Sequence, residues 1–186
     1  DRLTTTALLA ALLATLSGCA ERARVVPLAG AEVTPPARVD LCGTLSLPGH
    51  WPDGTPVNGL SDLAWEHDAG LLHLVSDRGW LHRARPRFEA GHLNGLSPID
   101  SHRLRDADGD PLEGSAADAE SLSLRHAANG KLGDTEYWIS FERDHRLQRF
   151  RPDGTPLAPP VRPEAAADAA ANKGMEAMTR HPEHGL

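Results

Sequence analysis

The sequence predicts an all-β protein, and within that class a β-propeller of antiparallel blades that is incomplete in this chain. Three observations predict this class: one stretch of sequence recurs in three copies, each copy alternates apolar with other residues, and one turn motif occurs twice. Alternation with a period of two is typical of half-buried strands. Repeated units of roughly 40–60 residues are typical of propeller blades. A β-sandwich is the alternative, although sandwiches do not usually repeat their sequence at this spacing.

The repeat is clearest in its first and last copies. Residues 63–71 (LAWEHDAGL) align without a gap with residues 178–186 (MTRHPEHGL), and residues 59–61 (GLS) align with residues 174–176 (GME) just before them. A middle copy occupies residues 118–124 (DAESLSL). The copies continue into similar apolar runs, which we interpret as second strands. We therefore expect strands at residues 60–65, 71–76, 119–124 and 137–141.

Turn signals separate these strands. The motif Pro-Asp-Gly-Thr-Pro occupies residues 52–56 and 152–156, and it combines a proline corner with a glycine for positive φ. An acidic–arginine pair follows the second strand of both complete units. The alanine-rich residues 164–171 predict a short helix. The third unit stops after its first strand, and a closed propeller needs about four to eight blades, so we expect the chain to be a fragment, the front part of a longer propeller.

The first nineteen residues predict a lipoprotein signal peptide. Arg2 precedes an apolar stretch at residues 7–16, which is too short to cross a bilayer and has the length of a signal core. This stretch runs into Leu16-Ser17-Gly18-Cys19, which resembles the lipobox of bacterial lipoproteins. The resemblance implies diacylation of Cys19, with palmitate-type chains as the membrane anchor. Ala20 is not Asp, which by similarity to enteric lipoproteins favours the outer membrane facing the periplasm.

The mature chain then divides into a tether at residues 20–40 and a folded domain at residues 41–186. The tether is rich in Pro and Ala and lacks apolar periodicity. With Cys19 lipidated, Cys42 is interpreted as a small buried apolar residue. A Cys19–Cys42 disulfide is the competing interpretation, because an exported protein folds in an oxidising compartment.

Composition and motifs exclude several function classes. The formal net charge is −7 and no run of Lys and Arg could follow a phosphate backbone, so we expect no nucleic acid partner. The sequence contains no Gly-x-Ser-x-Gly elbow for a serine hydrolase and no phosphate-binding Walker loop. Its ten histidines lack the spacing of a zinc site.

Three motifs in order resemble a known family. Residues 59–65 (GLSDLAW) with residues 75–79 (VSDRG) look like the opening blade of the "esterase-like activity of phytase" family. Residues 118–122 (DAESL) stand where that family has an Asp-x-Glu-Gly motif, with Ser121 in place of Gly. Residues 172–178 (NKGMEAM) match its Asn-Lys-Gly-x-Glu-x-Leu signature. The resemblance implies an exported propeller, often a lipoprotein, that hydrolyses an ester or phosphoester of a small molecule.

Equivalent positions of successive blades converge around a propeller axis, which predicts a site. Phosphoester hydrolysis needs carboxylates that hold a metal and orient water, and cations that bind the oxyanion. Oxygen ligands suit calcium. The candidate catalytic or metal-binding carboxylates are Asp77, Glu120, Glu142 and Glu176, and the candidate substrate-binding cations are Arg78, Arg143 and Lys173. The alternatives are structural Asp77–Arg78 and Glu142–Arg143 pairs, and a non-catalytic propeller that binds a ligand or partner.

Overall fold

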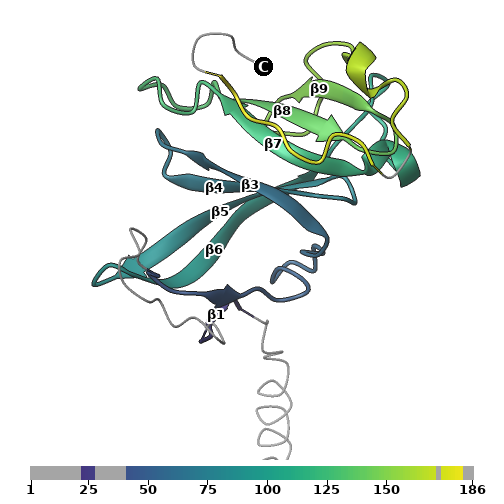
Figure 1. Cartoon of the computed structure of the whole chain (residues 1–186). Helices are drawn as coiled ribbons and strands as arrows, with labels where there is room; N and C mark the ends of the chain where they lie inside the picture. The colour runs from purple at the N-terminus through teal and green to yellow at the C-terminus, as the bar shows by residue number, and fades with distance from the viewer. Residues whose placement is uncertain (1–21, 28–40, 171–172, 182–186) are drawn as a thin grey trace, which may run out of the picture.

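Two stacked antiparallel sheets and a small two-stranded ribbon form the fold (Figure 1). The computed structural model describes residues 22–27, 41–170 and 173–181. Within those residues, no helix is long and apolar enough to cross a membrane. Blade 1 has the strand order β3 (Leu60–Glu66), β4 (Leu71–Ser76), β5 (Trp80–Glu89), β6 (His92–Arg103). Blade 2 has the order β7 (Ala119–Arg125), β8 (Glu136–Phe141), β9 (Arg146–Phe150), and the ribbon pairs β1 (Arg24–Val25) with β2 (Leu45–Ser46).

The all-β, antiparallel class is confirmed, and the sheets have the arrangement of incomplete propeller blades. All four predicted strands are present with ends within one residue of the expected ones. The Pro-Asp-Gly-Thr-Pro turns share one side-chain hydrogen bond. In each turn a side-chain oxygen of the aspartate, Asp53 or Asp153, accepts the N–H of the threonine two residues later at 2.9 Å.

Three expectations need correction. The helix predicted at residues 164–171 is only a 3₁₀ turn, η2 (Glu164–Ala166), because the run carries no apolar stripe that could pack on a sheet. The tether predicted at residues 20–40 is interrupted, since β1 pairs with β2 and belongs to the fold. Cys42 is exposed rather than buried, because it lies at the sheet surface, where its carbonyl accepts the N–H of Leu93.

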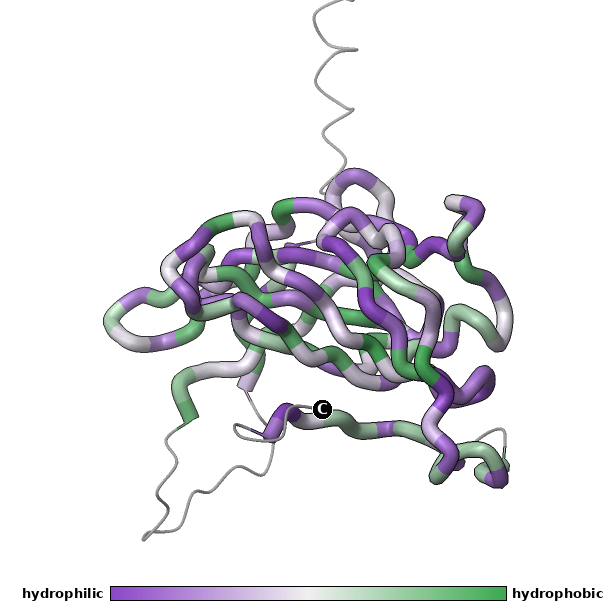
Figure 2. Tube along the Cα trace, turned by 90° about the horizontal axis from the view of Figure 1, so that it is seen from above, coloured by the Kyte–Doolittle hydropathy of each residue, from purple (hydrophilic) through white to green (hydrophobic). Residues whose placement is uncertain are grey.

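The main core lies between the blades. Val75 and Leu81 of blade 1 pack with Leu122, Ile139 and other apolar residues of blade 2, and all four are at most 4% exposed. Figure 2 shows apolar and polar residues alternating along many of the strands, as the sequence pattern requires. A second, smaller core lies on the opposite face of blade 1, where Trp51 and neighbouring residues pack against it.

The interface between the blades also holds a buried polar network. The Nε2 of His73 lies 2.8 Å from a carboxylate oxygen of Glu66, and its Nδ1 lies 2.7 Å from the hydroxyl of Tyr137. Thr135 donates to the other oxygen of Glu66 at 2.6 Å. Since carboxylate Glu66 accepts, Nε2 carries the proton and Tyr137 donates to Nδ1. The network therefore joins β3 and β4 of blade 1 to blade 2 with its hydrogen-bonding groups satisfied.

Candidate metal centre

One end of the two blades gathers the chain positions that the repeat makes equivalent. β3 begins and β4 ends there in blade 1, and β7 begins and β8 ends there in blade 2. Asp77 follows β4, and Glu142 follows β8. The repeat also equates Ser61, Glu120 and Glu176. The predicted carboxylates therefore come from the same end of successive units.

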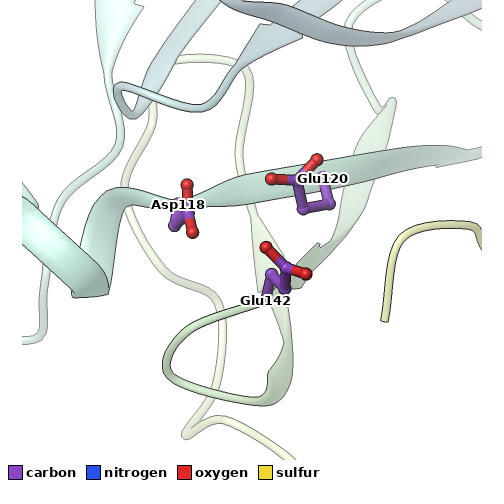
Figure 3. A group of neighbouring side chains, drawn as sticks. All are labelled: Asp118, Glu120 and Glu142. Carbon is purple, nitrogen blue, oxygen red and sulfur yellow. The ribbon is translucent and has the colours of Figure 1, made fainter. Parts of the chain in front are cut away.

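Three carboxylates form a cluster at this end: Asp118, Glu120 and Glu142 (Figure 3). One oxygen from each lies within 4.8 Å of the others. Asp118 precedes β7 and Glu120 lies in β7, while Glu142 comes from the loop after β8, as Figure 3 shows. The backbone holds the two segments together, because the N–H of Glu142 donates to the carbonyl of Asp118 at 3.0 Å. We call these three residues the acidic cluster.

The carboxylates of the cluster are shielded from water, and their negative charges repel one another. Asp118 is 7% exposed and Glu142 6%, while Glu120 is half-buried. Burial raises the pKa of Glu120, and the charges of Asp118, Glu142, Asp77 and Glu176 raise it further. Burial also raises the pKa of Asp118, against the opposing effect of Arg143. A positive charge placed among these oxygens would relieve both the desolvation and the repulsion.

Arg143 forms an ion pair with the cluster. Its Nε lies 3.0 Å from Oδ2 of Asp118, and its side chain is 54% exposed. The contact is an ion pair by distance only: among the described residues, that buried Asp118 oxygen accepts no hydrogen bond of acceptable geometry. A half-exposed guanidinium in this position leaves the carboxylate oxygen able to take another partner.

The acidic cluster has the chemistry of a calcium site. Calcium prefers carboxylate and carbonyl oxygens at about 2.3–2.6 Å, so two ligands of one ion are separated by at most about 5 Å. The 4.8 Å spread of the three carboxylates lies within that limit. The unsatisfied Asp118 oxygen is a further feature that a cation would satisfy. The residues present therefore fit a divalent, oxygen-preferring cation.

The other predicted residues surround the cluster less closely. Asp77 and Glu176 act on Glu120 through their charges. Arg78 is 65% exposed and its Nε lies 3.8 Å from an oxygen of Asp77, which is a loose pair rather than a fixed one. Lys173 is exposed. The predicted Glu142–Arg143 pair is replaced by Arg143–Asp118, because Arg143 turns toward the start of β7.

Asp118 is the residue that the sequence reasoning missed. Its signal in the sequence was its spacing: Asp118 lies two residues before Glu120 at the start of a strand, and this spacing places side chains on one side of a regular strand. The equivalent positions in the first and third units are Gly59 and Gly174. Gly59 has a φ of +61°, and a Cβ there would lie 2.0 Å from a carboxylate oxygen of Asp77. Only the middle unit therefore places two carboxylates at this position.

The third unit is anchored beside the cluster. Ser121 replaces the glycine of the family motif, and its hydroxyl lies 2.6 Å from that of Ser140. Ser140 in turn donates to the carbonyl of Met175 at 2.8 Å. Gly174 donates its N–H to Glu142 at 3.4 Å, and a Cβ on Gly174 would overlap His145. The start of the third unit thus lies along β8, which brings Glu176 toward Glu120.

Comparison with known proteins identifies the family. A family model described as "Phytase-like: Esterase-like activity of phytase" matches residues 55–186, a span that contains both blades and the whole acidic cluster. The chain belongs to this family. Comparisons with curated proteins and with solved structures find no significant match. The resemblance carried by the three sequence motifs is confirmed, and the acidic cluster lies within a phytase-like domain.

Proposed function

We propose that this phytase-like protein is a cation-dependent hydrolase of small esters or phosphoesters, anchored to the bacterial envelope by lipid on Cys19. The acidic cluster carries the catalytic part of the proposal, since three converging carboxylates at the end of the blades are an arrangement suited to a divalent cation. Family membership supports the reaction class. Cys19 lies outside the described residues, and its lipidation rests on the lipobox-like sequence.

Different residues of the site have different roles in this proposal. Asp118, Glu120 and Glu142 would hold the cation, of which calcium fits the donor set best. A bound cation supplies positive charge that stabilises the negative charge developing on the ester oxygens. Arg78 and Arg143 are more than half exposed next to the carboxylates, where they can bind the anionic oxygens of a substrate. Exposed Asp77 and Glu176 are available to orient a water molecule.

The hydrolase proposal is tested with chromogenic esters. The purified mature protein is assayed on 4-nitrophenyl phosphate and 4-nitrophenyl acetate, with calcium chloride and with EGTA. We expect calcium-dependent hydrolysis of at least one ester, reduced at least tenfold in Asp118→Asn and Glu120→Gln. Glu89→Gln is the matched control, because Glu89 is an exposed carboxylate of the β5–β6 hairpin. Calcium binding without hydrolysis of either ester would instead support a non-catalytic envelope propeller.

The anchor is tested separately. Cys19→Ala should release the protein from the membrane fraction and abolish incorporation of labelled palmitate. A protein that stays in the membrane fraction after this substitution would contradict the lipid anchor. The soluble Cys19→Ala protein should retain the hydrolase activity, because the acidic cluster belongs to the folded domain.

A further inference from the structure

The side of blade 1 that faces away from blade 2 is apolar, and it is open over β3, beyond the second core. In the register of β3 and β4, Leu63 opposes Leu74 and Trp65 opposes Leu72, so these four side chains share that side. We call them the far face. Leu63 is 59% exposed and Trp65 48%. Large exposed apolar side chains that adjoin one another mark an interaction surface more often than a free one.

The repeat indicates what kind of partner covers such a surface. The residues of blade 2 equivalent to Leu63 and Trp65 are Leu122 and Leu124. Leu122 opposes Ile139, as Leu63 opposes Leu74. In blade 2, however, Leu122 is 4% exposed and Ile139 0%, because this side packs against blade 1. Blade 2 thus buries on its preceding neighbour the position that Leu63 leaves exposed in blade 1, while Leu74, the equivalent of Ile139, is already buried in the second core.

A groove lies between the far face and the ribbon of β1 and β2. Its volume is about 410 Å³, and the lining residues are mostly leucines. Leu45 and Leu47, in and next to β2, form one wall, and Leu63 and Leu72 of the far face line the groove as well. The ribbon contacts the outermost strand, β6, and Figure 1 shows β1 on the side of the sheet opposite blade 2. The ribbon thus occupies the outer part of this side, and the groove occupies the inner part.

We infer that β1 and β2 are the outer strands of a further blade, and that the groove receives the inner strands of that blade from the same polypeptide. Two strands of two residues each are not stable as an isolated sheet. A strand added to the free edge of β2 would pair its backbone and cover Leu63 and Trp65. The incoming blade would present the side that blade 1 presents to blade 2, which carries His73 and Val75. This inference does not depend on the proposed hydrolase activity.

Cysteine protection tests the inference. The protein is produced from its whole gene with Cys19→Ala and Cys42→Ser, and Leu63→Cys is compared with Leu132→Cys, which replaces a loop leucine 73% exposed. In a monomer confirmed by sedimentation, maleimide should label position 63 at least 100-fold more slowly than position 132. Equal labelling rates in the monomer would overturn the inference. Protection that disappears on dilution would also overturn it, since the occupant would then be a second copy.

A measurement on the unsubstituted chain guards against a variant that fails to fold. In hydrogen–deuterium exchange, the amides of Leu45 and Ser46 should be as protected as those of β4, because they belong to a complete sheet. Leu63→Asp should lower the melting temperature by several degrees, while Leu132→Asp should leave it unchanged. Fast exchange in β2 together with no effect of Leu63→Asp would show that the far face is open.

Discussion

The buried network between the blades and the acidic cluster at their end use buried carboxylates in opposite ways. Glu66 is 4% exposed, and both of its oxygens accept hydrogen bonds, one from His73 and one from Thr135. Asp118 is nearly as buried, yet one of its oxygens accepts no hydrogen bond within the described structure, and its close neighbours include two carboxylates. The network supplies hydrogen-bond donors to both oxygens of its buried carboxylate, and the acidic cluster leaves one oxygen of Asp118 without a donor among the described residues.

This difference separates a structural carboxylate from one of the candidate site. A buried charge that is fully hydrogen-bonded fixes the packing of the elements around it. Buried like charges with too few donors destabilise the fold, and a bound cation offsets that cost. Glu66 and Asp118 are buried to nearly the same extent, so burial alone does not distinguish the two kinds of carboxylate. The hydrogen-bond partners of each carboxylate distinguish them.

The strongest test of the comparison removes the satisfied carboxylate. Glu66→Ala should lower the free energy of unfolding by about 4 kcal/mol, because it removes two buried hydrogen bonds to a charged group and leaves His73 and Thr135 without that partner. Urea denaturation measures the change. Glu89→Ala is the control, and it should change the stability by less than about 0.5 kcal/mol. A small loss in Glu66→Ala would mean that the network does not hold the blades together.

Acid should destabilise blade 1 through two buried histidines, His73 of the network and His82, whose Nδ1 accepts from Trp51 on the other side of the blade. Burial lowers the pKa of His82 to about 4, against a weak opposing effect of Asp53, and burial also lowers the pKa of His73. The unfolded chain therefore binds protons that the folded chain does not, and stability falls as the pH drops from about 6.5 to about 4. His82 alone accounts for about 3 kcal/mol over that range.

The measurement is urea denaturation at several pH values. His82→Asn should flatten the pH dependence in the range from about 6.5 to about 4, whatever its effect on stability at neutral pH. An unchanged slope in this variant would show that His82 takes up its proton in the folded protein as readily as in the unfolded one.

Calcium should stabilise the unsatisfied region. A ligand that binds only the folded state, at 100 times its Kd, raises the free energy of unfolding by about 2.7 kcal/mol. We expect such a rise in calcium chloride over EGTA, measured by urea denaturation. Asp118→Asn should abolish most of it and should raise the stability of the calcium-free protein, because it removes one of the repelling charges. Equal calcium effects in the parent and in Asp118→Asn would place any calcium elsewhere.

The smallest expected effect concerns the approach of Asp77 to the cluster. Gly59→Ala places a Cβ where the carboxylate of Asp77 now lies, at a positive φ. We expect a loss of about 1 kcal/mol in unfolding free energy and a reduction of hydrolase activity severalfold, as Asp77 is displaced. Gly109→Ala is the matched control, because Gly109 has a similar φ of +89° and open space around it. Equal losses of activity in both variants would show that the position of Asp77 is unimportant.

The sequence by itself determined the local structure of this protein. Alternating apolar residues and glycine turns specify strands and their ends without help from distant residues, so β4 (Leu71–Ser76) was predicted with its observed limits. The recurrence of one pattern also indicated the stacking of like units and the convergence of their equivalent positions. Glu120 and Glu142 could be proposed as site residues for that reason.

Only the tertiary structure decided which side chains meet. The pairing of Arg143 with Asp118 joins two loops of blade 2, and the buried network of Glu66 joins residues from different sheets; no local pattern encodes either contact. β1 was missed because a two-residue strand has too little alternation to be recognised, and it forms by pairing with β2. Burial and hydrogen-bond partners are properties of the packed chain, and they determine that Glu66 is structural and that Asp118 belongs to the candidate site.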